Sequence, residues 1–98
     1  MIERIVRMSF ETASITDFLH VFERSKAAIA AFPGCKGLRL LKDLHHDHVF
    51  LTYSYWDSED DLNAYRNSEL FKTTWAQTKI LFNQKPIAWS VHTIDTVK

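Results

Sequence analysis

The sequence predicts an α+β fold in which the elements follow one another as β-α-β-β-α-β. Three observations lead to this prediction. Stretches near both ends and in the middle of the chain alternate between apolar and polar residues or are rich in β-branched and aromatic residues, as strands are. Two stretches between them carry apolar residues at helical spacing. No linker or low-complexity segment interrupts this order, so we expect a single domain over residues 1–98.

The first strand is predicted over residues 2–10. Its even positions are apolar apart from Arg4, and they share one face that includes Met8 and Phe10. Arg7 falls on the opposite face together with Ile5. Because one face is the more apolar, we expect it to pack against the helices.

The first helix is predicted from residue 14 to about Phe32. Ser14 and Asp17 have the spacing of a capping box, in which the serine caps the helix and the acid lies three residues further on. Pro33-Gly34 ends the helix, because proline cannot continue the hydrogen-bond ladder and glycine tolerates the positive φ of a helix exit.

Two strands follow, at residues 36–43 and 48–56, joined by a hairpin-sized polar turn. Ser58 and Asp61 repeat the capping-box spacing and open a short helix, which breaks near Asn67-Ser68 before a longer helix. Residues 87–97 form the fourth strand after Pro86. This order is that of the ferredoxin-like fold, a four-stranded antiparallel sheet with its helices on one face.

The composition narrows the function classes. Twelve basic side chains balance twelve acidic ones, so no field of one sign favours binding to nucleic acid or to an anionic membrane. The middle of the chain is nevertheless acidic, since residues 43–71 hold one basic and seven acidic residues. Most of these acids lie at predicted helix starts, where they interact favourably with the helix dipole, so we interpret them as capping residues. A single cysteine and the lack of an apolar run long enough to span a bilayer favour the cytoplasm.

The third strand predicts how the sheet is covered. Phe50 and Trp56 lie on one of its faces, whereas Leu51, Tyr53 and Tyr55 lie on the other. Both faces are therefore apolar or aromatic, and the chain's own helices can cover only one. We expect a homodimer of face-to-face sheets, with a ligand cavity between each sheet and its own helices.

The histidines and the cysteine have simpler interpretations than a site. The sequence fixes no histidine near Cys35, so we expect no nucleophilic role for this thiol. His45, His46 and His48 fall in the hairpin turn, and their spacing nominates no fourth ligand, so we expect no metal site. His20 and His92 can act as acid or base only if they reach a pocket, and a structural role is favoured.

The chain resembles the antibiotic biosynthesis monooxygenase family of the dimeric α/β-barrel superfamily. Three segments carry the resemblance over nearly the whole length: Phe32-Pro33-Gly34, the strand 50–56 leading into Asp57-Ser58, and residues 64–72. The family implies a dimeric α/β barrel. The superfamily includes cofactor-free oxygenases, haem degraders and small isomerases, so the resemblance says less about chemistry than about fold.

The neighbouring haem-degrading branch uses a histidine, a tryptophan and an asparagine. The resemblance places Trp75 at the histidine position, Tyr65 at the tryptophan position and Arg7 at the asparagine position. An indole nitrogen has no free lone pair for iron, so Trp75 cannot be the axial ligand. We therefore expect no haem and no other cofactor.

The oxygenase branch implies a cofactor-independent monooxygenase that acts on a small aromatic or quinol-type substrate. Four pocket candidates follow: Tyr65 as a hydrogen-bond donor, Phe71 and Trp75 as stacking surfaces, and Arg7 as an anchor for a phenolate or carboxylate. Each also has an interpretation without function, since Tyr65, Phe71 and Trp75 can be packing residues of the core and Arg7 a solvated or dimer-bridging one. Catalytic residues are not assigned. The alternatives are a non-catalytic ligand-binding or stress-related dimeric module, and haem binding through another histidine.

Overall fold

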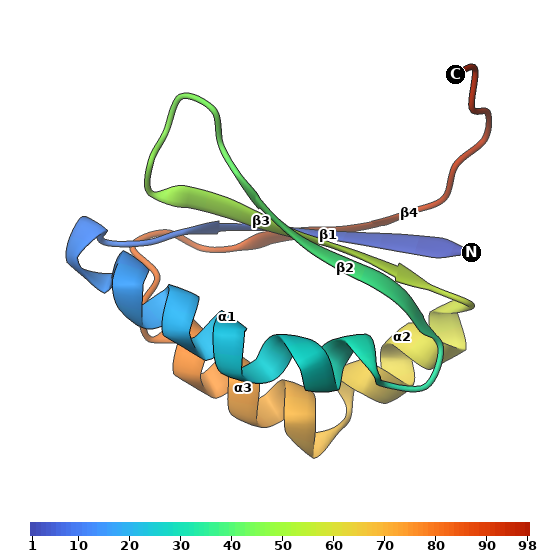
Figure 1. Ribbon diagram of the computed structural model, residues 1–98, viewed down its shortest axis with the longest axis horizontal. Helices are drawn as coiled ribbons and strands as arrows, with labels where there is room; N and C mark the ends of the chain where they lie inside the picture. The colour runs from blue at the N-terminus through green and yellow to red at the C-terminus, as the bar shows by residue number, and fades with distance from the viewer.

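The computed structural model describes residues 1–98 as two layers, a sheet and three helices that all lie on one of its faces (Figure 1). The strands are β1 (Ile2–Ser9), β2 (Cys35–Lys42), β3 (Val49–Trp56) and β4 (Ile87–Val91). They form one open sheet in the order β2-β3-β1-β4, and all neighbouring strands are antiparallel. The helices are α1 (Ile15–Ala30), α2 (Glu59–Arg66) and α3 (Glu69–Lys79). The predicted ferredoxin-like α+β fold is confirmed.

The strand register separates two sets of side chains. Arg4 of β1 lies opposite Ser54 of β3 and Ser90 of β4. Arg7 lies opposite Leu51 and Ile87. Because residues paired across antiparallel strands point to the same side of the sheet, and positions three apart point to opposite sides, these two arginines project to opposite faces. We call the face that the helices cover the inner face and the other the outer face.

The second and third helices begin as the sequence predicts. The Ser58 hydroxyl accepts a hydrogen bond from the Asp61 backbone N–H at 3.1 Å and caps α2. The Ser68 hydroxyl accepts one from the Phe71 backbone N–H, also at 3.1 Å, and caps α3. The break between these helices therefore comes from a new cap at Ser68.

The start of the first helix differs from the prediction. A 3₁₀ turn, η1 (Thr12–Ser14), precedes α1, and Ser14 has helical φ and ψ of −97° and −4°. A capping side chain needs an extended backbone at the cap, and the Ser14 side chain accordingly makes no capping bond. The chain enters α1 from a helical turn, so the expected capping box is absent there.

The exit of α1 follows the prediction at Gly34. This residue has φ of +87°, which a side chain rarely allows. A Cβ atom there would also lie 2.4 Å from the Asp61 side chain. Gly34 thus permits both the turn and the close approach of α2 to it.

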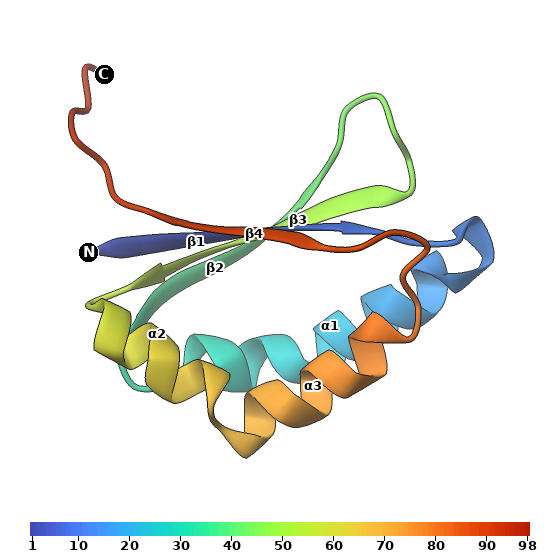
Figure 2. The same cartoon turned by 180° about the vertical axis from the view of Figure 1, so that it is seen from behind.

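The fourth strand is shorter than predicted and ends at Val91 rather than near residue 97. Val91 pairs with Glu3, close to the beginning of β1 at Ile2. Beyond this point β1 offers almost no backbone to pair with, so the strand-like sequence 92–97 continues as an unpaired segment. Figure 2, which views the molecule from the β4 edge, shows this tail leaving the sheet on the side away from the helices.

The densest core lies at one end of the inner face. Met8, Phe10, Phe18 and Phe50 form a buried cluster, and the Phe10 and Phe18 rings stack with their centroids 4.3 Å apart. Other apolar residues of α1, of the sheet and of the segment after α3 surround this cluster. None of the helices is long and apolar enough to cross a membrane.

Candidate functional site

A cavity of about 310 Å³ lies between the inner face of the sheet and the three helices. At one end its wall is formed by buried side chains of the core, including Met8 and Phe18. At the other end it reaches the exposed side chain of Arg66, the last residue of α2. The cavity therefore has an apolar inner end and a polar end near the surface. Its volume lies at the lower end of the range of small-molecule sites.

Three of the four sequence candidates, Tyr65, Phe71 and Trp75, line this cavity. Tyr65 is on α2, and the other two lie one turn apart on α3. The Phe71 and Trp75 rings are nearly parallel, with an interplanar angle of 11° and centroids 5.8 Å apart. The edge-on contact of Tyr65 with Phe71, at 5.3 Å, joins the two helices into one aromatic wall.

Tyr65 is held firmly by its aromatic neighbours. Its ring stacks on the fully buried Trp56 at 4.9 Å and meets Phe32 edge-on at 5.5 Å. Its ring is mostly shielded from solvent, whereas its hydroxyl makes no hydrogen bond within the chain and stays accessible, since no buried side-chain oxygen of the chain lacks a partner. Burial, and then the nearby Cys35 thiol, raise the pKa of Tyr65 to about 12. At neutral pH the hydroxyl is protonated and is able to donate a hydrogen bond to a molecule in the cavity.

The fourth candidate, Arg7, is not brought to the cavity. It projects from the outer face, beside Leu51 and Ile87, because its position in β1 has the opposite parity to that of the inner residues. Arg4, three positions earlier, lines the cavity instead. Sequence reasoning had placed Arg4 on the apolar face of the strand, and this parity was the signal that could have identified it as the arginine of the site.

Polar groups gather where Arg4 enters the cavity. The Arg4 Nη1 donates a hydrogen bond to the Ser90 hydroxyl at 2.9 Å. The Ser54 hydroxyl, directly across from Arg4, accepts a hydrogen bond from the Trp56 Nε1 at 2.9 Å. Its own proton thus stays free to donate. Arg66 from α2 completes this group and makes no hydrogen bond or ion pair with its guanidinium.

The histidines lie elsewhere. His20 and His92 are exposed and do not line the cavity. His46 contacts Asp43 in the turn between β2 and β3, with 3.0 Å between Nδ1 and Oδ1. No group of three or more histidine, cysteine or acidic side chains is placed to hold a metal ion.

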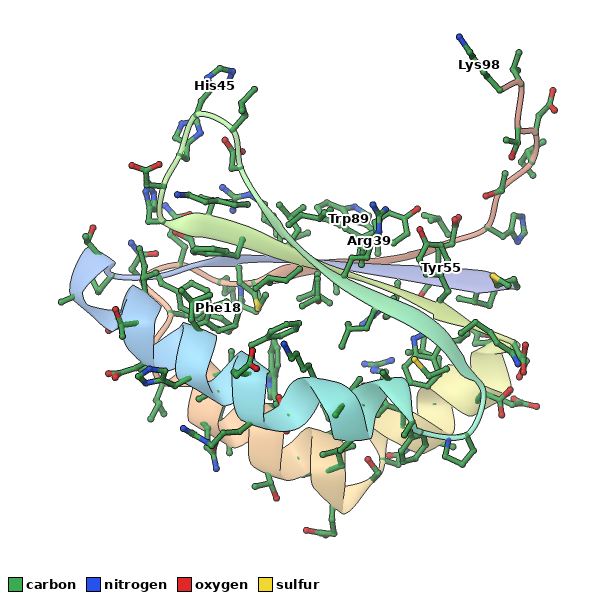
Figure 3. All side chains as sticks on the ribbon, viewed as in Figure 1. Phe18, Arg39, His45, Tyr55, Trp89 and Lys98 are labelled. Atoms are coloured by element: carbon green, nitrogen blue, oxygen red, sulfur yellow. The ribbon has the colours of Figure 1, made fainter.

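The outer face of the sheet differs from the cavity, because its arginine and tyrosine side chains contact one another. The Arg39 guanidinium lies 5.1 Å from the centroid of the Tyr53 ring and donates a hydrogen bond to the Tyr55 hydroxyl at 3.3 Å. The exposed β4 residues Ile87 and Trp89 lie on the same face. Figure 3 shows Arg39, Tyr55 and Trp89 on the side of the sheet away from Phe18 and the helices. The side chains that led us to expect a sheet-to-sheet dimer therefore lie together.

Comparison with known proteins identifies relatives of this chain. The sequence profile of the family described as antibiotic biosynthesis monooxygenase matches residues 1–77. No curated protein matches the sequence significantly. Many solved structures share its fold.

The crystal structure of an antibiotic biosynthesis monooxygenase is similar, with a TM-score of 0.90, 15% identity, and coverage of 97% of this chain and 100% of that one. Rv0793 from Mycobacterium tuberculosis gives a TM-score of 0.89 at 14% identity, covering 99% of this chain and 98% of that one. PA3566 from Pseudomonas aeruginosa gives 0.83 at 18% identity, covering 96% and 94%. Identities this low establish the fold alone.

Proposed function

The chain belongs to the antibiotic biosynthesis monooxygenase family, and we propose that it is a cofactor-independent monooxygenase of a small aromatic or quinol-type substrate. The observation that carries this proposal is the cavity with its aromatic wall and the unpartnered Tyr65 hydroxyl. A flat ring fits beside the parallel rings of Phe71 and Trp75, where offset stacking is favourable. We further propose that the protein acts in the cytoplasm as a homodimer.

The proposed reaction needs no cofactor and no further reductant from the protein. In the simplest case a methylene group of an electron-rich phenol reacts with O₂, one oxygen atom forms a carbonyl group and the other leaves as water. The methylene carbon supplies the four electrons and both hydrogens, so the equation balances without a further reductant. The protein's part is to orient the ring, exclude water and stabilise the substrate anion that reacts with O₂. Tyr65 is the donor best placed for that anion, since its hydroxyl stays protonated at neutral pH.

The cavity fits haem poorly. No histidine or cysteine lines it, and Trp75 stands where the haem-degrading branch is expected to have its axial histidine. Tyr65 is the only tyrosine on the wall, and its raised pKa disfavours the tyrosinate that would bind iron. The Met8 thioether, another type of haem ligand, is packed in the buried core cluster. We therefore derive no step through haem.

One observation favours a second function, a ligand-binding module without turnover. The cavity wall holds no carboxylate and no imidazole, so no general base is positioned there. A substrate acidic enough to ionise without such a base is compatible with catalysis, whereas a less acidic ligand is bound and released unchanged. The stress-related role expected from the sequence belongs to this second function.

The test is oxygen consumption by the purified protein with hydroxylated anthrones and quinols. We expect uptake above the rate in buffer, and a fall of roughly tenfold in Tyr65→Phe, which removes one hydrogen bond to the reacting anion. Tyr55→Phe removes a hydroxyl from the outer face and serves as the matched control. Uptake at the buffer rate with every compound, together with a thermal shift on binding, would leave only the binding module.

A further inference from the structure

We propose that the cavity selects an aromatic carboxylate, with Arg4 and Arg66 holding its acidic group and the aromatic wall holding its ring. The inference rests on the proposed function in one respect, because it concerns the cavity in which that function places the substrate. It adds the charge of the ligand and the residues that recognise it.

The first argument is the charge of the cavity wall. Of the twenty residues that line it, two are arginines and none is an aspartate or glutamate. The four ion pairs of the structure all involve other residues, on α1, on β2 and in the loops. Arg4 and Arg66 thus carry two positive charges into one cavity without a counter-ion. An anionic ligand would supply the missing charge.

The second argument is the hydrogen-bonding capacity left over at this end of the cavity. A guanidinium group has five N–H donors. Arg4 uses one of its nitrogens on a neutral hydroxyl, that of Ser90, and Arg66 has no partner in the chain. The Ser54 hydroxyl has its proton available. Unused donors outnumber unused acceptors among these groups, because the two guanidiniums have no acceptor, so the complementary ligand group is an acceptor with several lone pairs.

The third argument is the mutual effect of the two arginines. Burial, and then the positive charge of Arg66, lower the pKa of Arg4 below its ordinary value. Arg4 stays charged at neutral pH, since an arginine pKa begins so high. Its charge is nevertheless unfavourable there, because it is partly desolvated and lies near a second positive charge. A bound anion between the guanidiniums would compensate both the lost hydration and the repulsion.

A carboxylate is the anion that we infer for this site. Its two oxygens match the planar fork of a guanidinium, and each oxygen can accept from a different arginine. The aromatic part then extends from the exposed Arg66 end toward Phe71 and Trp75. With a cavity of about 310 Å³, one or two fused rings are a suitable size.

The experiment compares 2-naphthoate with 2-naphthamide, which has nearly the same shape but no charge, using calorimetry at pH 7 and low salt. We expect the acid to bind at least tenfold more tightly than the amide, as charge-assisted hydrogen bonds predict. Arg4→Gln and Arg66→Gln should each weaken naphthoate binding by roughly tenfold and change naphthamide binding by less than about twofold.

Two further variants guard against trivial results. Arg24→Gln removes an exposed arginine of α1 that does not line the cavity, and it should leave both affinities unchanged. Arg4→Lys keeps the charge but not the planar fork, so it should retain a preference for the acid that is smaller than in the wild type, and this result is readable even if Arg4→Gln folds poorly. Equal affinities for acid and amide in the wild type, or an equal loss in Arg24→Gln, would overturn the proposal. An ionised nitronaphthol that binds as tightly as naphthoate would overturn the choice of a carboxylate.

Failure of this inference is distinguishable from failure of the proposed function. Oxygen uptake with neutral quinols and no preference for acids would overturn the carboxylate site and keep the oxygenase. Selective naphthoate binding that Arg4→Gln and Arg66→Gln abolish, without oxygen uptake on any substrate, would keep the carboxylate site and overturn the oxygenase.

Discussion

The two faces of the sheet come from the same four strands, yet helices cover one of them and nothing in the chain covers the other. The inner face packs against three helices and still encloses a cavity. The outer face carries apolar and aromatic side chains of similar size, and nothing in the chain covers them, with Trp89 43% and Ile87 47% exposed. Each face also receives one arginine of β1, Arg4 inside and Arg7 outside.

This difference indicates that the inner face is suited to binding a small ligand and the outer face to association with another chain. The inner face is aromatic at one end and lined with unpaired donors at the other, which suits a small ligand. The outer face is broad and open, and its Arg39, Tyr53 and Tyr55 are paired with one another. Such a surface suits a second sheet better than a small molecule.

The largest effect is expected in the inner core. Phe10→Ala removes a fully buried ring that contacts Phe18, Phe50 and Phe82, so the free energy of unfolding should fall by about 3–5 kcal/mol. Urea unfolding measures this loss. Leu44→Ala, at an 87% exposed position in the β2–β3 turn, is the control and should cost less than about 0.5 kcal/mol.

Should Phe10→Ala not fold, Phe10→Leu gives the same test with a smaller loss. A cost below about 1 kcal/mol for Phe10→Ala would mean that the inner face is not the main source of stability. The free energy of unfolding would then have to come mainly from contacts outside this core.

The next effect concerns assembly through the outer face. We expect the wild type to scatter light as a dimer of twice 11.5 kDa. Leu51→Asp places a carboxylate on the outer face of β3, a strand in the middle of the sheet, and should weaken the dimer at least tenfold, because the interface would bury this carboxylate together with Arg7, which lies opposite it, in place of an apolar contact.

Leu19→Asp makes the same chemical change at a 40% exposed position of α1 and should leave the mass unchanged. A wild-type protein that remains at 11.5 kDa at the highest attainable concentration would contradict the dimer. The outer face would then need another partner.

Much of this contrast follows from the period of the strands. Alternation in residues 2–10 and 48–56 assigned the side chains of β1 and β3 to their faces, and the capping box at Ser58 and the break near Asn67-Ser68 placed the second and third helices. Arg7 came from a family position rather than from parity, and the structure places it on the outer face, away from the cavity. In a strand a shift by an odd number of residues moves a side chain to the other face.

Other features depend on contacts that a linear pattern does not contain. Ser14 has the spacing of a cap, but the preceding 3₁₀ turn gives it a helical backbone. The end of β4 is set by where its partner β1 begins. Whether the aromatic stripe of α3 fills the core or lines a cavity depends on how closely the helices approach the sheet, so the sequence could name Phe71 and Trp75 but not distinguish the two roles.

A titration sharpens the comparison between tyrosines on the two faces. Tyr65 should ionise with a pKa of about 12, above the ordinary tyrosine value of about 10, because its ring is buried among aromatic residues. The folded state therefore holds the phenolic proton more tightly than the unfolded state does. The stability that this provides is complete below pH 10 and is lost as the pH rises toward 12.

Absorbance at 295 nm follows this ionisation, and the step near pH 12 should be missing in Tyr65→Phe. It should remain in Tyr55→Phe and in Tyr53→Phe, and the second control is needed because burial and the nearby Glu3 also raise the pKa of Tyr53. Between pH 10 and 12, Tyr65→Phe should also lose less stability than the wild type. A single transition at the ordinary value, with no difference between the variants, would show that the Tyr65 hydroxyl is well hydrated and would weaken its role as a donor.

The smallest effect is expected for Arg66→Gln in the absence of a ligand. Because Arg66 and Arg4 repel each other, removal of one charge should raise the melting temperature, by about 2 °C given the exposure of Arg66. Added salt screens such a repulsion, so the gain should shrink between low salt and 0.5 M salt. Arg24→Gln should show no gain, and a lower melting temperature in Arg66→Gln would mean that the favourable interaction of Arg66 with the C-terminal end of α2 outweighs the repulsion. A variant that melts higher yet binds naphthoate more weakly would indicate that the inner face retains an unfavourable pair of charges for its ligand, whereas the outer face pairs its polar groups within the sheet.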